Sequence, residues 1–65
     1  MIINGTKVKE LRGDKRLSAA QLGAAIEMSH TWVFSIEAKE EAEVKTHTAH
    51  ALARVLGVKV RDLAT

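Results

Sequence analysis

The sequence predicts a small all-α domain built from five short helices. Apolar residues recur at the three- and four-residue spacing of an amphipathic helix in several segments, and serine or threonine precedes most of them. The chain contains no proline and no cysteine, so neither disulfides nor thiolate metal sites can stabilise it. Its 65 residues suffice for one domain with one core, which apolar helix packing must hold together.

The first helix is expected to begin after Thr6 as N-cap and to end near Arg16, with Val8 and Leu11 facing inward. The apolar residues 1–3 lie before it and outside any helix. They could form a short N-terminal strand that pairs with a dimer partner, or they could be a frayed terminus.

Residues 18–37 predict two short helices with only about three residues between them. Ser18 and Ser29 are suitable N-caps for the second and third helices. The apolar positions expected to face the core are Leu22, Ala25 and Ile26 in the second helix, and Val33 and Ile36 in the third. So short a break forces the helices to meet at a steep angle. That is the arrangement of a helix-turn-helix, whose second helix can enter the major groove of DNA.

The last third of the sequence predicts a fourth helix capped by Thr46 and a final helical turn over residues 60–63. The fourth helix has a complete apolar stripe, formed by Ala49, Leu52, Ala53 and Leu56. Gly57 is a typical helix stop. Residues 38–45 are expected to form a charged connection between the third and fourth helices.

Charge is distributed unevenly along a chain whose net charge is only +2. Residues 1–17 and 44–65 are basic, whereas residues 37–43 carry four glutamates and a single lysine. A basic domain favours polyanionic partners, although ordinary solvated helix faces would give a similar pattern. No apolar run approaches the roughly 20 residues of a membrane span, and no signal-peptide core follows the basic start. We therefore expect a cytoplasmic protein without membrane contact.

Several further residues occur in an order and spacing that are characteristic of one family: Leu11-Arg12, Leu17-Ser18, Leu22, Ala24, Ser29, Val33, Ile36-Glu37, the run over residues 52–58, and Leu63. In these residues the chain resembles the Cro/cI-type helix-turn-helix family, the phage-repressor or xenobiotic-response-element-like domains. The resemblance covers roughly residues 8–63. It implies a lambda-repressor-like bundle of five helices that binds operator DNA as a homodimer, and a transcriptional repressor of a phage or mobile element.

The resemblance also implies which residues read bases. His30, Thr31 and Ser35 match the base-reading positions of the third helix, with Trp32 and Phe34 beside them. Histidine can donate to or accept from a base edge, and threonine offers a hydroxyl and a methyl group suited to thymine. Each aromatic residue could instead be partly buried in the core or could anchor a protein partner.

If DNA is bound, phosphate contacts must come from Lys39 and Lys45, from the helix N-termini with Ser18 and Ser29, or from lysines of the first helix. The same resemblance also implies a structural ion pair. The ion pair would join Arg12 in the first helix to Glu37 at the end of the third and would clamp the two helices together.

The chain departs from the family pattern at three positions and in its charge. Ala19 stands where a phosphate-binding glutamine is common, Glu27 where the turn usually has glycine, and Gly23 where alanine is usual. The third helix has no lysine or arginine, and acidic residues follow it where phosphate contacts are expected. A protein-interaction module on the same scaffold, using Trp32 and Phe34, is therefore the alternative function.

No enzymatic motif is present, so neither catalysis nor a cofactor is expected. His47 and His50 lie three residues apart and could share a metal with Glu43. Histidine pairs at helix starts are usually only solvated, and no metal site is expected there.

Overall fold

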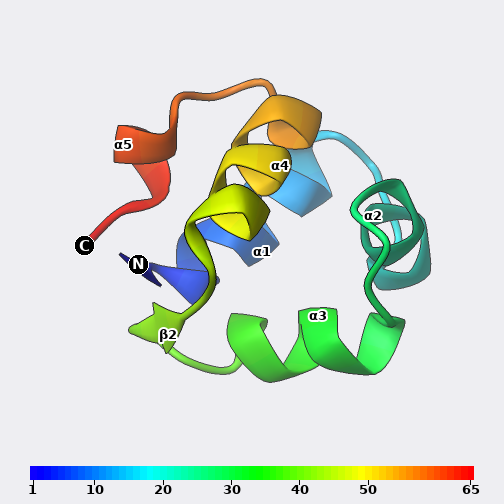
Figure 1. Ribbon diagram of the computed structural model, residues 1–65. Coiled ribbons are helices and arrows are strands. Elements are labelled where there is room, and N and C mark those ends of the chain that lie inside the picture. The colour runs from blue at the N-terminus through cyan, green and yellow to red at the C-terminus, as the bar shows by residue number, and fades with distance from the viewer.

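Five helices and a two-stranded antiparallel sheet make up the computed structural model, which describes all residues 1–65 (Figure 1). The elements follow in the order β1 (Ile2–Ile3), α1 (Gly5–Asp14), α2 (Ala19–Ala25), α3 (His30–Glu37), β2 (Ala42–Glu43), α4 (Thr46–Leu56) and α5 (Val60–Leu63). The predicted fold class, a five-helix lambda-repressor-like domain with a short N-terminal strand, is confirmed. No helix has the length and apolar character that would let it cross a membrane.

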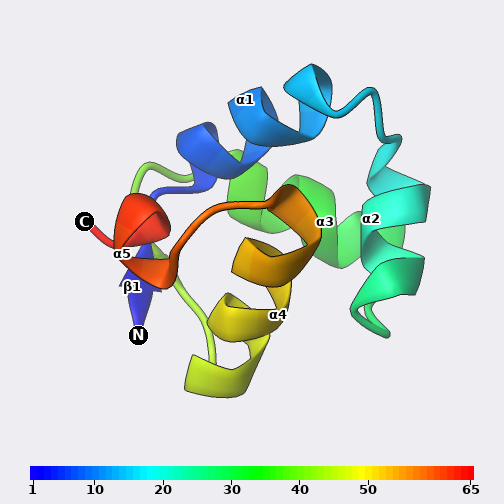
Figure 2. The ribbon, with the colours of Figure 1, turned by 90° about the horizontal axis from the view of Figure 1, so that it is seen from above.

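One apolar core receives a side chain from nearly every element. The fully buried large residues are Ile3 of β1, Val8 of α1, Leu22 of α2, Val33 of α3, Leu52 and Leu56 of α4, and Leu63 of α5. Figure 1 shows α1 and α4 in the middle of the molecule, with α3 along the lower side and α2 at its right end. Figure 2 gives the same arrangement from above, with α5 and the termini at the end opposite α2. Helix α3 is thus fixed on one face by the core and is free on the other.

The N-terminal strand pairs within the chain. Strand β1 lies antiparallel to β2, with Ile2 opposite Glu43 and Ile3 opposite Ala42, and Ile3 also forms a bridge to Ala64. Both expectations for residues 1–3, pairing with a dimer partner and a frayed terminus, are therefore wrong. Residues 38–45 are not merely a charged connection, because the buried residues Ala42 and Val44 alternate with exposed charged residues, Glu41, Glu43 and Lys45. That alternation of apolar and charged residues is the period of a half-buried strand.

Two helix starts differ from the prediction. Helix α1 begins at Gly5 and is capped by Asn4, whose Oδ1 accepts a hydrogen bond from the Lys7 amide at 3.1 Å, so Thr6 is not its N-cap. Asparagine is at least as good an N-cap as threonine, and Asn4 stands one turn before Val8, the first large buried residue of the helix. Helix α4 has Lys45 at the N-cap position without a side-chain cap, and Thr46 is its first residue.

Helix α1 begins at a glycine because its start packs against the end of α3. A Cβ atom added to Gly5 would lie 1.8 Å from the Ile36 carbonyl oxygen and 2.4 Å from that of Lys39. Only glycine permits this approach, so Gly5 sets the distance between the two helices.

Three further predictions about the helices can be compared with the structure; one is confirmed and two are corrected. Gly57 ends α4 in the left-handed conformation, at φ 73°, as a helix stop requires. Helix α1 ends at Asp14 with Lys15 as C-cap, two residues before the expected end at Arg16, which has a positive φ of 56°. Ala25 is exposed, not part of the core stripe, since Ala19, Leu22 and Gly23 face inward from α2.

Candidate nucleic-acid interface

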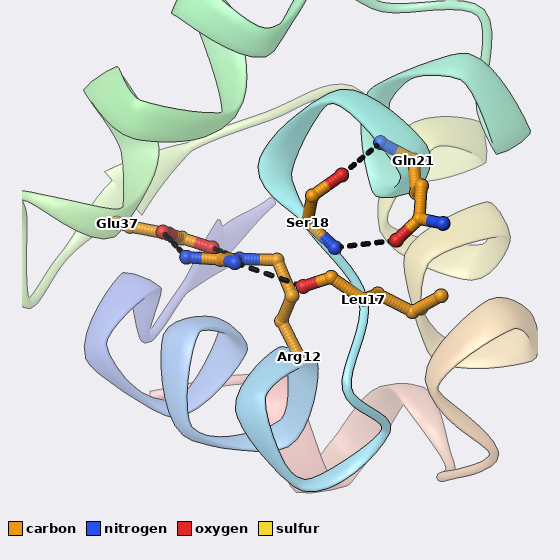
Figure 3. Close-up of polar contacts among 5 residues, drawn as sticks. All are labelled: Arg12, Leu17, Ser18, Gln21 and Glu37. Atoms are coloured by element: carbon orange, nitrogen blue, oxygen red, sulfur yellow. Dashed lines mark hydrogen bonds and ion pairs between the residues drawn. The ribbon is translucent and has the colours of Figure 1, made fainter.

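Both helices of the helix-turn-helix begin at a capping serine. Ser18 Oγ accepts from the Gln21 amide at 3.0 Å, and Gln21 Oε1 accepts from the Ser18 amide at 2.7 Å (Figure 3). This reciprocal capping box was not predicted, although the Ser-x-x-Gln spacing signals it. Ser29 Oγ accepts from the Trp32 amide at 3.1 Å. Each serine hydroxyl accepts from its own helix and keeps its proton for an acceptor in solvent.

A tight turn fixes the angle between α2 and α3. Glu27 has a φ of 60°, which is in the left-handed region. In the family pattern this position is usually glycine, which adopts that conformation without strain. A non-glycine residue at this position lowers the stability of the fold by about 1 kcal/mol. The turn also folds closely over α2, because a Cβ atom on Gly23 would lie 2.6 Å from the Met28 carbonyl oxygen. Gly23 therefore serves close packing where the family pattern has alanine.

The outward face of α3 carries the residues expected to read bases. Val33, Ile36 and Glu37 are buried, whereas His30, Thr31, Phe34 and Ser35 are exposed. Positions four residues apart lie on one line along a helix, so the exposed residues form two rows, His30 with Phe34 and Thr31 with Ser35. The Ser35 hydroxyl donates to the Trp32 carbonyl at 2.8 Å, so toward solvent it offers its acceptor lone pairs.

The two aromatic residues of α3 lie on opposite flanks of the helix. Phe34 is 54% exposed and borders a shallow hollow of about 170 Å³ between α1 and α3, which Lys9 and Arg12 also line. Trp32 is half-buried against the core and borders a second hollow of about 310 Å³, toward β2 and the start of α4. A partner that engages both rings, as the protein-interaction alternative supposes, would therefore have to contact the two flanks of α3 separately.

An ion pair fixes the helix-turn-helix to α1. Arg12 Nε donates to Glu37 Oε2 at 2.7 Å, and Nη2 donates to Oε1 at 2.9 Å (Figure 3). The third guanidinium nitrogen, Nη1, donates to the Leu17 carbonyl at 2.9 Å, directly before the capping serine of α2. The hydrogen bonds with Glu37 raise the pKa of Arg12 above its usual value. One side chain thereby connects α1, the entry to α2 and the end of α3. The contact with Leu17 was not predicted, because a backbone carbonyl has no signature in the sequence.

Two of the four glutamates in residues 37–43 have cationic partners. The Glu37 side chain is only 4% exposed and is paired with Arg12, and Glu43 Oε2 lies 2.7 Å from the Met1 ammonium group. Glu40 and Glu41 are exposed and form no hydrogen bond or ion pair. The acidic segment thus presents two unpaired carboxylates, Glu40 and Glu41, directly after Lys39 in the sequence. Its charge toward solvent is therefore less negative than its composition suggests.

The remaining candidate residues are placed at the ends of α3 and α4. Lys39 and Lys45 are exposed, one just after α3 and the other at the start of α4. His47 and His50 are exposed as well, and the structure brings together no three histidine, aspartate or glutamate side chains that could hold a metal.

Comparison with known proteins gives one family match. A family model described as a helix-turn-helix domain matches residues 5–65. No curated protein matches the chain.

Solved structures share the fold. SinR, described as the master regulator for biofilm formation and solved in complex with DNA, has a TM-score of 0.80 at 22% identity, over 91% of this chain and 94% of that one. The restriction-modification controller protein C.AhdI from Aeromonas hydrophila has a TM-score of 0.77 at 26% identity, over 89% and 86%. Iron(II) HppE, solved in complex with substrate, has a TM-score of 0.84 at 21% identity, but the match covers 94% of this chain and only 34% of that one. The fold therefore also occurs as one part of a longer chain.

Proposed function

The chain belongs to the helix-turn-helix domain family of the Cro/cI type, and from that premise we propose that it binds double-stranded DNA sequence-specifically as a homodimeric transcriptional repressor. One observation carries the proposal. Helix α3 is held by its buried face, by Glu37 and by the turn before it, while its other face presents hydrogen-bonding and apolar groups to solvent. Those are the groups that distinguish base pairs in the major groove.

On this proposal, Thr31 and Ser35 face base edges from the middle of α3, and His30 and Phe34 face them from the side nearer α1. Threonine can contact a thymine methyl group, and the free lone pairs of Ser35 can accept from the amino group of adenine or cytosine. Trp32 lies on the far flank, where it can reach a sugar or the edge of the groove. Because α3 has no cationic side chain, its contacts specify sequence and add little electrostatic affinity.

Phosphate contacts would flank α3, the proposed recognition helix. The hydroxyls of Ser18 and Ser29 can donate to phosphate at two helix N-termini, where the backbone amides also favour an anion. Lys39 and Lys45 supply the positive charge. Two lysines per protomer make a modest contribution, so we expect tight binding only for a dimer on two half-sites about one helical turn apart.

Repression follows from occupancy of an operator, and a phage or mobile-element switch is the setting that the family resemblance suggests. Such a regulator acts on DNA in the cytoplasm. The proposal assigns the chain binding and no catalysis, cofactor or metal.

Selection from a random-sequence duplex pool at low salt tests the proposal. We expect enrichment of one motif with two related halves, and two protomers per duplex in sedimentation of the complex. Failure to enrich any sequence would contradict the proposal and favour the protein-interaction alternative. In that case Trp32 and Phe34 would have to engage a partner separately, from the two flanks of α3.

A further inference from the structure

His30 and Phe34 form an aromatic pair on the outside of the recognition helix. Their ring centroids are 6.2 Å apart and their ring planes meet at 86°, the edge-to-face arrangement that aromatic rings favour. Both residues are exposed, and neither belongs to the apolar core. The pair therefore contributes little to the fold and is available to a ligand.

Phe34 is unusual among the exposed residues. It is one of three large apolar side chains with substantial exposure, and the other two, Met1 and Ile2, lie at β1. The inward positions of α3 are already filled by Val33 and Ile36. An apolar ring on the outer face of this helix favours binding if it is buried against an apolar group of the ligand. In the major groove that group is the C5 methyl of thymine.

The contact with Phe34 also restricts the imidazole ring. His30 is the first residue of α3, and the structure gives its side chain no hydrogen-bond partner. Without Phe34 the ring would be free to change rotamer, and a hydrogen bond to a base would then have to order it. Packed against Phe34, the imidazole has a defined orientation from which an N–H can donate to the N7 acceptor of a purine.

We infer that His30 and Phe34 act as one base-recognition unit, in which Phe34 contacts a thymine methyl and positions His30 to donate to a purine N7 one or two base pairs away. The spacing fits, because 6.2 Å between the rings lies between one and two base-pair steps of about 3.4 Å. The inference rests on the proposed function. It goes further in naming the base groups recognised and in making the two recognitions interdependent.

The experiment uses the duplex motif that the wild-type chain selects. Each thymine is replaced in turn by uracil, which removes only the methyl group, and each purine by its 7-deaza analogue, which removes only the N7 acceptor. Affinities are measured for the wild type and for Phe34→Ala, Phe34→Leu and Phe34→Tyr. Ile2→Ala, which removes exposed apolar surface at β1 and leaves the outer face of α3 unchanged, is the matched control.

For the wild type we expect one thymine-to-uracil change to weaken binding about fourfold, the loss for one buried methyl group. A nearby 7-deazapurine should weaken it by at least as much. Phe34→Ala should abolish the first effect and reduce the second. Phe34→Leu should keep the methyl effect and lose the purine effect, whereas Phe34→Tyr should keep both. Ile2→Ala should match the wild type throughout.

Two results would overturn the inference while leaving the proposed function intact: no uracil effect anywhere in a motif that the wild type binds specifically, or a Phe34→Ala variant with the wild-type pattern of effects. Enrichment of no motif at all would overturn the proposed function and this inference together.

Discussion

Arg12 and Glu37 face each other as a planar pair in which two guanidinium nitrogens donate to the two carboxylate oxygens, at 2.7 and 2.9 Å. The remaining guanidinium nitrogen holds the Leu17 carbonyl. The pair therefore ties the recognition helix and the entry to α2 to a single point on α1. Such two-point geometry is specific to arginine, and lysine could not reproduce it.

Arg12→Ala should destabilise the domain by about 3–5 kcal/mol, because it leaves the Glu37 carboxylate buried without a partner. A loss of that size approaches the whole stability of a 65-residue domain, at about 0.05–0.15 kcal/mol per residue. Urea denaturation checks this, with Arg54→Ala on the exposed side of α4 as the control. A variant as stable as the wild type would show that the pair is not needed for folding.

The stabilisation by this pair should not depend on pH between about 6 and 10. The folded-state pKa of Arg12 is raised, so its contribution is complete below the unfolded-state pKa and is lost only as the pH rises through the still higher folded value. Both pKa values lie above the pH range of this experiment. The difference in unfolding free energy between the wild type and Arg12→Met should stay constant over the range. A difference that shrinks toward pH 10 would contradict the assignment.

Two glycines in α1 should respond oppositely to alanine. At Gly5 the added Cβ would lie 1.8 Å from the Ile36 carbonyl oxygen, so Gly5→Ala must push α1 away from α3 and should cost about 1–3 kcal/mol or more. At Gly13 nothing lies within 4 Å, so Gly13→Ala should stabilise by about 0.5–1 kcal/mol through its higher helix propensity. Thermal melts of the two variants make the comparison, and shifts of the same sign would contradict it.

Removing the hydroxyls on the outer face of α3 should change sequence preference and leave the fold intact. Thr31 and Ser35 are exposed and outside the core, so Thr31→Ala and Ser35→Ala should melt within a few degrees of the wild type. Each lost base contact should relax discrimination at its own position by about 1–3 kcal/mol. Repeated duplex selection with the double variant is the measurement, and Thr6→Ala on α1 is the control. An unchanged motif would exclude both residues from base recognition.

Much of this structure could be predicted because the signals are local. The capping serines, the stripe of α4 and the stop at Gly57 depend on near neighbours and are as predicted. What could not be predicted depends on distant partners. Strand β1 is a strand because β2 lies beside it, and Gly5 is required because Ile36 approaches it in space.

The charge of the acidic segment shows the same limit within the candidate site. The sequence has four carboxylates in residues 37–43. The family resemblance predicted that Arg12 pairs with one of them, Glu37, but nothing in the sequence predicted that Glu43 pairs with the Met1 ammonium group. The sequence also does not reveal that Trp32 and Phe34 border separate hollows. It predicts only that neither ring occupies the core face of the helix, which Val33 and Ile36 fill. The family resemblance predicted the Arg12–Glu37 ion pair and the base-reading positions of α3. The neighbours of these residues became known only from the folded structure.

The salt dependence of affinity for the selected duplex and for a scrambled duplex tests the central claim most directly. With Lys39 and Lys45 contacting phosphate in each protomer of a dimer, log affinity for the selected duplex should fall against log salt with a slope of about −3 to −4. Lys45→Gln should lower the slope by about one per protomer, and Lys59→Gln, near α5, should leave it unchanged. The selected duplex should also bind at least about a thousandfold more tightly than the scrambled one. Equal affinity for the two duplexes at every salt concentration would contradict sequence-specific recognition by α3.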